Sequence, residues 1–585
     1  MTGFRASAAV FAALIVLGGT AAAQAPTGGP VPLGPAVRPP PTQVPAAPPR
    51  AAPSRSDLPV QVDHLSAVDP DSVGLLGDGD GGLGVDLWRG TSRALAANLI
   101  QSLPAPLESA AMRALARRLL LTTATAPNGK PADGPLLLAR ARKLTELGIP
   151  SASVDLVRAA PAAAMDERLA QVEVEGLFFG NDNSGACARV RGIDDKELYW
   201  QQALAYCLAL AGEGEKAAMI ADLLRERGSE APPSFFALME AIGGDKNVKV
   251  EPSGEPSALA LSMMRAANRK LPDPVARSER AAVLRVVALS PNAELGTRLM
   301  AAERAEALGA ITAGELAEID AAVPFTPEEM SNATSVAEAQ WGPRGRALLL
   351  RAALAQNAPV ARIPILARAF ALGREKSEIA AVRRVMAPSL SGIEPSQDTL
   401  SVAADAGATL YALGRVKDAG AWYDAVEQAA PGNPDAARAW TTLWPLSMLA
   451  AKPATWDPSI VLRWRNAQAG TGKDDAARVR AATLFALFDA LGQNVPAEGW
   501  AGLLRDARPV EASLPDPAVW YALDNAARER RRGETVALAL LAIGPRGPGA
   551  ANPLTLSSVI VALVRAGLES DARALALEAA VAQGG

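Results

Sequence analysis

The sequence predicts an all-α protein built from repeated pairs of helices, and three observations favour this fold class. First, 49% of the 585 residues are hydrophobic but only 4% are aromatic, so the apolar mass is mostly Ala, Leu and Val. Alanine has the highest helix propensity and loses no side-chain entropy on burial. Second, a helix that ends in a glycine turn and is followed by another helix recurs along the chain. Third, the sequence has no series of alternating, β-branched segments that would predict a sheet.

Residues 1–23 have the features of a secretory signal peptide. Arg5 supplies the positive charge, residues 8–17 form a short apolar segment, and three alanines at 21–23 offer a cleavage site. We expect cleavage after Ala23 and no transmembrane anchor afterwards, because the apolar run is shorter than the roughly 18 residues that a bilayer requires. The Ala-, Gly-, Pro- and Arg-rich usage is typical of bacteria with GC-rich DNA, so the expected location is the periplasm.

Residues 24–60 are expected to form a disordered, proline-rich linker. The stretch from 26 to 59 contains 12 prolines, which cannot continue a helix and favour an extended chain. A proline-rich ligand for a partner domain is the alternative. Beyond the linker, Gly-, Pro- and Ser-rich breaks divide the body into an N-terminal helical-repeat region (61–245), a middle helical region (255–390) and a C-terminal repeat region (395–585).

Glycine turns mark the helix pairs of the body. Glycine just past the end of a helix tolerates the left-handed backbone that reverses the chain. The predicted turn glycines are Gly148, Gly212, Gly309, Gly373, Gly414, Gly492 and Gly567. Because one pair of helices cannot bury its apolar face alone, repeated pairs are expected to stack into a superhelix.

The pair around Gly414 resembles the tetratricopeptide repeat, over residues 400–433. The two small positions of that family fall on Gly407 and Ala419, and its turn glycine falls on Gly414. Its aromatic position falls on Tyr423 and its closing proline on Pro431. Ala403 stands where the family has its first aromatic residue, and the other copies are irregularly spaced. The resemblance is therefore to a degenerate array, and it implies a TPR-like α-solenoid that binds proteins.

The same resemblance implies a partner-binding groove at Ser401, Asp405 and Tyr411. Seven of the ten tryptophans lie between residues 422 and 520. Among them, Trp440 and Trp444 are four residues apart and share one helical face, where aromatic side chains could anchor a peptide or glycan. The alternative is that these rings fill gaps between alanine-rich helices.

The stretch GLLGDGDGGLGVDLW, residues 74–88, is the segment that most resembles a ligand loop. Its acidic residues are Asp78, Asp80 and Asp86. Calcium binding is one interpretation, but a β-roll needs several copies, and Arg89 stands where an EF-hand requires a bidentate Glu. A dinucleotide loop would require a parallel sheet. The favoured interpretation is a turn that enters the first helix, with Leu87 and Trp88 packed beneath it.

The sequence holds few residues suited to catalysis or metal binding. His64 is the only histidine and lies just past the linker, which argues against a Ser-His-Asp triad and against zinc or iron sites with several histidines. We therefore expect no catalytic residue, no cofactor and no metal site. The net charge of −4 argues against nucleic acid as a partner. Cys187 and Cys207 are expected to form a disulfide in an oxidising compartment, the alternative being two buried thiols.

Together these observations predict a periplasmic, non-catalytic scaffold or adaptor. Its expected partner is an envelope protein or peptide, with peptidoglycan as a further candidate. One alternative is an enzyme that acts on peptidoglycan or another polysaccharide with carboxylates alone, because a glycosidase needs only two acids. A secretion or assembly helper is another alternative.

Overall fold

The fold is all-α, as predicted. The computed structural model describes residues 68–130, 134–193, 196–228, 230–245, 247–250, 254–450, 457–469, 474–504 and 514–584. These residues form α-helices numbered α1 to α28 and short 3-10 helices, and their strand pairing is limited to two isolated bridges. The predicted signal peptide, the linker and His64 lie outside the described residues.

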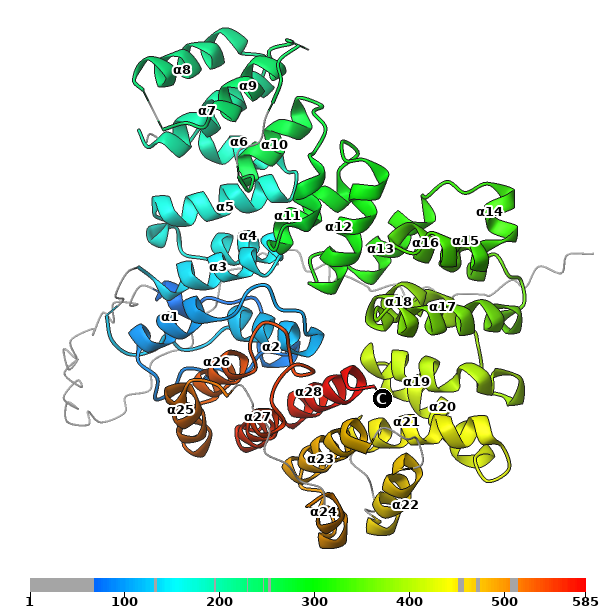
Figure 1. The fold of residues 1–585 in the computed structure, drawn as a ribbon. Coiled ribbons are helices and arrows are strands. Elements are labelled where there is room, and N and C mark those ends of the chain that lie inside the picture. The colour runs from blue at the N-terminus through cyan, green and yellow to red at the C-terminus, as the bar shows by residue number, and fades with distance from the viewer. Residues whose placement is uncertain are drawn as a thin grey trace, which may run out of the picture. The chain divides into compact units, whose positions relative to one another are not determined.

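The helices follow one another in chain order (Figure 1). Up to residue 250 they are α1 (Arg93–Ser102), α2 (Ala110–Leu121), α3 (Leu136–Glu146), α4 (Pro150–Arg158), α5 (Glu167–Phe179), α6 (Asn183–Val190), α7 (Leu198–Leu210), α8 (Gly214–Glu226) and α9 (Pro233–Ile242). Between 254 and 390 they are α10 (Ala258–Ala266), α11 (Ala281–Leu289), α12 (Leu295–Ala307), α13 (Ala313–Ala321), α14 (Pro327–Ser331), α15 (Ala333–Ala339), α16 (Pro343–Leu354), α17 (Ile363–Glu375) and α18 (Ile379–Met386). After residue 400 they are α19 (Ala403–Ala412), α20 (Val416–Ala429), α21 (Pro434–Ala450), α22 (Pro458–Ala469), α23 (Asp474–Ala490), α24 (Ala497–Leu504), α25 (Pro517–Arg528), α26 (Arg532–Ile543), α27 (Pro553–Arg565) and α28 (Glu569–Ala582).

Six of the seven predicted turn glycines reverse the chain between paired helices. These six have φ between +70° and +82° and are Gly148, Gly212, Gly309, Gly414, Gly492 and Gly567. The prediction was wrong for Gly373, which lies inside α17, because this helix continues to Glu375 and the chain turns at Ser377, with φ of +58°. A Cβ atom at Gly373 would lie 2.8 Å from Val382 Cγ2, so this glycine serves the close approach of α17 and α18 instead.

Small residues also bring α19, α20 and α21 together. A Cβ atom on Gly407 of α19 would lie 2.7 Å from Leu443 Cδ2 of α21. Ala419 of α20 is fully buried, and Tyr423, one turn later, is nearly so. Because Gly407 and Ala419 are as small as the family pattern requires, α19 packs against both α20 and α21. The chain is thus a degenerate helical-repeat protein.

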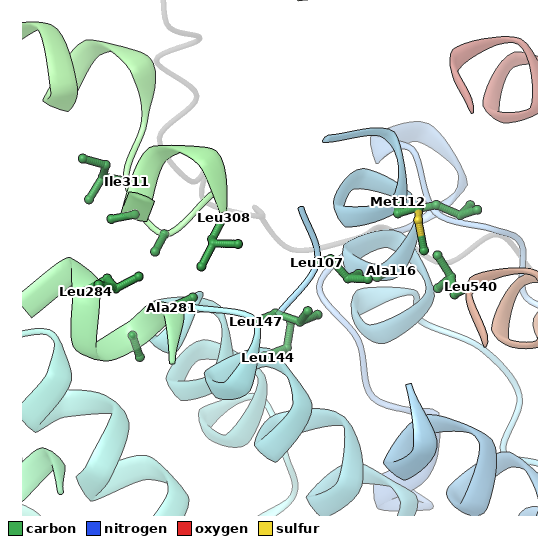
Figure 2. Packing of buried hydrophobic residues seen from close by; sticks show 14 of the residues in the cluster. Leu107, Met112, Ala116, Leu144, Leu147, Ala281, Leu284, Leu308, Ile311 and Leu540 are labelled. Atoms are coloured by element: carbon green, nitrogen blue, oxygen red, sulfur yellow. The ribbon is translucent and has the colours of Figure 1, made fainter. Parts of the chain in front are cut away.

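The last helices of the chain pack against the first ones. α26 contacts α1 and α2, and α28 contacts α2, α19 and α21 (Figure 1). Figure 2 shows Met112 and Ala116 of α2 beside Leu540 of α26, all three of them buried. Residues Ala67–Gly585 accordingly form one compact unit.

The predicted breaks of the body lie between helices of the described residues. The break between 245 and 255 falls between α9 and α10, and the break between 390 and 395 falls between α18 and α19. The three-region division itself stays a prediction. None of the helices in the described ranges combines the length and the apolar content needed to cross a bilayer.

Candidate functional site

The predicted groove residues differ in their exposure to solvent. Ser401 is exposed, whereas Tyr411 of α19 is only 2% exposed, and burial raises the pKa of its hydroxyl to about 12. Asp405 is buried too, and its Oδ1 lies 2.5 Å from Arg374 Nη1 of α17. The carboxylate of Asp405 thus joins two helices. Partner binding in this region stays a prediction, and Ser401 is the position that offers surface to a partner.

The two predicted tryptophan anchors lie in the core. Trp440 and Trp444 of α21 are 6% and 2% exposed, and their ring centroids are 5.9 Å apart. The ring of Trp444 is also 5.8 Å from that of Trp464 in α22, whose Nε1 donates a hydrogen bond to Thr441 O at 2.8 Å. This placement agrees with the interpretation that the rings fill gaps between alanine-rich helices.

The glycine-rich stretch 74–88 packs the chain start against α26. Leu87 and Trp88 are buried, as expected. Leu87 O accepts a hydrogen bond from Gly533 N at 2.9 Å, and a Cβ atom on Gly533 would lie 2.9 Å from the Trp88 ring. Arg532 donates to Leu83 O at 2.7 Å. The backbone of this stretch therefore has a structural role in joining an early segment of the described residues to α26.

The aspartates of that stretch are exposed. Asp78 and Asp80 belong to a 3-10 helix, and Asp86 forms an ion pair with Arg89 at 3.2 Å. In the part of the chain that the structure describes, no group of three His, Cys, Asp or Glu residues is arranged to hold a metal ion.

Cys187 and Cys207 form the expected disulfide. The bond joins α6 to α7, with the two Cα atoms 5.3 Å apart and a sequence separation of 20. Both cysteines are buried. The bridge therefore restricts the relative position of two consecutive helices of the N-terminal region.

One cavity, of about 480 Å³, is rich in carboxylates. Its charged lining residues are Arg142, Glu146, Glu175, Glu255, Glu279 and Arg280. Burial raises the pKa of Glu175 in α5, and Gln171 Nε2 donates a hydrogen bond to this carboxyl at 3.0 Å. A carboxyl with a raised pKa beside other acids is what a general acid requires. This cavity is therefore where carboxylate-only chemistry would be sought.

A larger cavity, of about 630 Å³, is rich in arginines and lies among α2, α12, α18, α19, α28 and the loop that follows α26. Its charged lining residues are Glu108, Arg113, Arg304, Glu306, Arg383, Arg384, Arg546 and Glu578. Sequence reasoning missed this site. Its residues come from six separated segments, and no local spacing marks them as neighbours.

Comparisons with known proteins add little to this description. No protein-family model matches the chain, and no curated protein matches it significantly. Among solved structures, the chain is similar to the crystal structure of the pentatricopeptide repeat protein PPR10 from maize, at 14% sequence identity and a TM-score of 0.15, over 75% of this chain and 72% of that chain. A TM-score of 0.15 does not establish a shared fold. The helical-repeat architecture is instead evident from the pairing of helices within the chain.

Proposed function

We propose that this protein is exported to the periplasm and acts there as a non-catalytic scaffold that binds envelope proteins through its helical-repeat surface. The observation that carries the proposal is the serial pairing of helices at glycine turns, from Gly148 to Gly567. Arrays of this kind present extended surfaces, and they bind partners with those surfaces.

Two features support export. The N-terminal 23 residues have the pattern of a signal peptide. The bond between Cys187 and Cys207 is of a kind that persists in oxidising compartments and is rare in a reducing cytosol. Fractionation of cells, followed by alkylation and mass analysis, tests this part: a periplasmic protein that begins at Gln24 and takes up no alkylating reagent is expected.

Structural use of buried charges supports a non-catalytic role. Arg140 is fully buried, and it donates to Leu120 O at 2.7 Å and to Val73 O at 2.6 Å. Glu173 is paired with Arg158 at 2.8 Å. These groups hold segments of the body together, which is a structural use of their charge.

Binding is tested with the purified protein as bait in a detergent extract of the envelope. We expect a specific envelope protein that elutes in a fixed ratio to the bait. The matched control is the same bait with its disulfide reduced and alkylated under denaturing conditions, which removes the folded surface but keeps the composition. Equal capture by both baits would contradict recognition by a folded repeat surface.

The second candidate function is a carboxylate-dependent enzyme that acts on peptidoglycan, and the cavity around Glu175 favours it. Incubation with cell-wall sacculi separates the two candidates. A scaffold leaves the sacculi intact, whereas an enzyme releases muropeptides and loses that activity in the Glu175→Gln variant. Asp222→Asn, a substitution at an exposed ion pair, is the matched control.

A further inference from the structure

The cavity among α2, α12, α18, α19 and α28 carries an excess of positive charge. Five arginines and three glutamates line it, so its formal charge is positive in a chain whose net charge is −4. Positive charges held together in a partly desolvated space repel one another unless anions compensate them.

Two of the three glutamates already form an ion pair or hydrogen bonds within the protein. Glu306 Oε2 lies 2.8 Å from Arg384 Nε. Glu578 Oε2 accepts hydrogen bonds from Ser109 Oγ and Ala111 N, both at 2.9 Å, so its charge stabilises the start of α2. The charges of both carboxylates also favour the charged form of Arg113, so they act mainly on Arg384 and Arg113.

The hydrogen bonds of Arg113 go to uncharged groups, although the charges of Glu578 and Glu306 also act on it. Among the described residues its guanidinium donates to main-chain oxygens, including Ala307 O at 2.6 Å and Glu108 O at 2.7 Å. Burial lowers the pKa of Arg113, and it also lowers the pKa of Arg383 in α18. The cavity thus disfavours the charged form of two of its own arginines, a cost that a bound anion would relieve.

Arg304 and Arg546 have no ion-pair partner within the described ranges. Arg304 is half-buried in the last turn of α12, and Arg546 is exposed in the loop between α26 and α27. Both line the same cavity. A guanidinium offers a planar set of donors that matches a carboxylate or a phosphate, so each of these two arginines is suited to bind one.

Most of the remaining wall of the cavity is apolar, and part of it is exposed to solvent. Leu308, Ile379, Leu413 and Val581 contribute to it, and Leu413 is 39% exposed, so this part of the wall reaches solvent. A volume of about 630 Å³ suits a small molecule.

We propose that this cavity binds a small organic anion: a carboxylate or phosphate head paired with Arg304 and Arg546, and a short apolar body that contacts Leu308 and Leu413. This ligand site goes beyond the scaffold function and does not depend on it. The two proposals can therefore fail separately: ligand binding can be measured without a protein partner, and partner binding can be measured without the ligand.

Calorimetric titration with octyl phosphate and with octanoate, each below its micelle concentration, tests the proposal. We expect saturable binding of at least one of them at one site per chain, and none of the uncharged octyl glucoside. The Arg304→Gln/Arg546→Gln variant should bind about tenfold more weakly or worse. The matched control is Arg117→Gln, which removes an exposed arginine of α2 outside the cavity and should bind as the wild type does.

Leu413→Glu provides a second, independent variant, because it places a negative charge on an exposed part of the cavity wall without disturbing a buried position. It should also weaken binding about tenfold or more, because the added carboxylate repels an anion bound in the cavity. Absence of saturable binding, equal binding of octyl glucoside, or wild-type affinity in both the double variant and Leu413→Glu would each overturn the proposal.

Discussion

Replacing Asp320 by asparagine should stabilise the protein at neutral pH and change its stability little near pH 4. Asp320 lies in α13 with 1% of its surface exposed, and its Oδ2 has no hydrogen-bond partner among the described residues. The nearby guanidinium of Arg346 is bound to Glu303 at 2.8 and 2.5 Å and also to Glu378. Burial, and secondly the charge of Glu303, raise the pKa of Asp320 to about 7.

The size of the effect follows from this shift. Below pH 3.8 the carboxyl is protonated in both the folded and the unfolded chain, so it does not oppose folding. Between pH 3.8 and about 7 the unfolded chain releases the proton while the folded chain retains it, and the free energy of unfolding falls as the pH rises. A shift from 3.8 to about 7 corresponds to a loss of about 4 kcal/mol that is complete above pH 7. Asparagine cannot ionise, so the variant avoids this loss.

Urea unfolding followed by far-ultraviolet circular dichroism, at pH 4, 5.5 and 8, measures the difference between Asp320→Asn and the wild type. The difference should grow with pH toward about 4 kcal/mol. Asp222→Asn, on an exposed face of α8, should give a small difference that does not grow in this way. A variant that is no more stable than the wild type at pH 8, or equally stabilised at pH 4 and pH 8, would refute the reasoning.

Substitution of Cys187 and Cys207 by serine should lower the free energy of unfolding by about 3 kcal/mol, from the entropy of the loop that the disulfide closes at a sequence separation of 20. Urea unfolding with and without reductant checks this, and a wild type that is insensitive to reductant would contradict it. Gly407→Val should cost about 1–3 kcal/mol, because its Cβ would lie 2.7 Å from Leu443 Cδ2. Gly420→Ala, on the same repeat but with no atom within 4 Å of the added Cβ, should instead stabilise by up to about 1 kcal/mol. Thermal unfolding of both variants compares them, and similar losses would show that close packing at Gly407 is not the cause.

The helix pairs could be predicted from the sequence because local signals determine them. Glycine at the end of a helix is needed wherever the backbone must turn left-handed, and this holds at Gly148 and Gly414. The signal failed at Gly373, because the need for glycine there comes from Val382 on the neighbouring helix rather than from the turn. Local patterns cannot separate these two reasons for a glycine.

Long-range features could not be predicted in this way. The packing of Trp88 against Gly533 joins segments more than 400 residues apart, and neither sequence segment indicates the other. The same holds for the arginine-rich cavity, where Arg113 and Arg546 become neighbours only after the chain has folded. Trp440 illustrates a third case: a ring that could fill the core or bind a ligand has the same helical spacing in both situations.

Photo-crosslinking in living cells tests the proposed scaffold most directly. A photoreactive amino acid at Ser401, which is exposed beside α19, would capture whatever contacts the repeat surface. We expect a light-dependent adduct between this protein and an envelope protein, recovered in the periplasmic fraction. The absence of any adduct from Ser401 and from other exposed positions of the repeat helices, or adducts with cytoplasmic proteins alone, would contradict it.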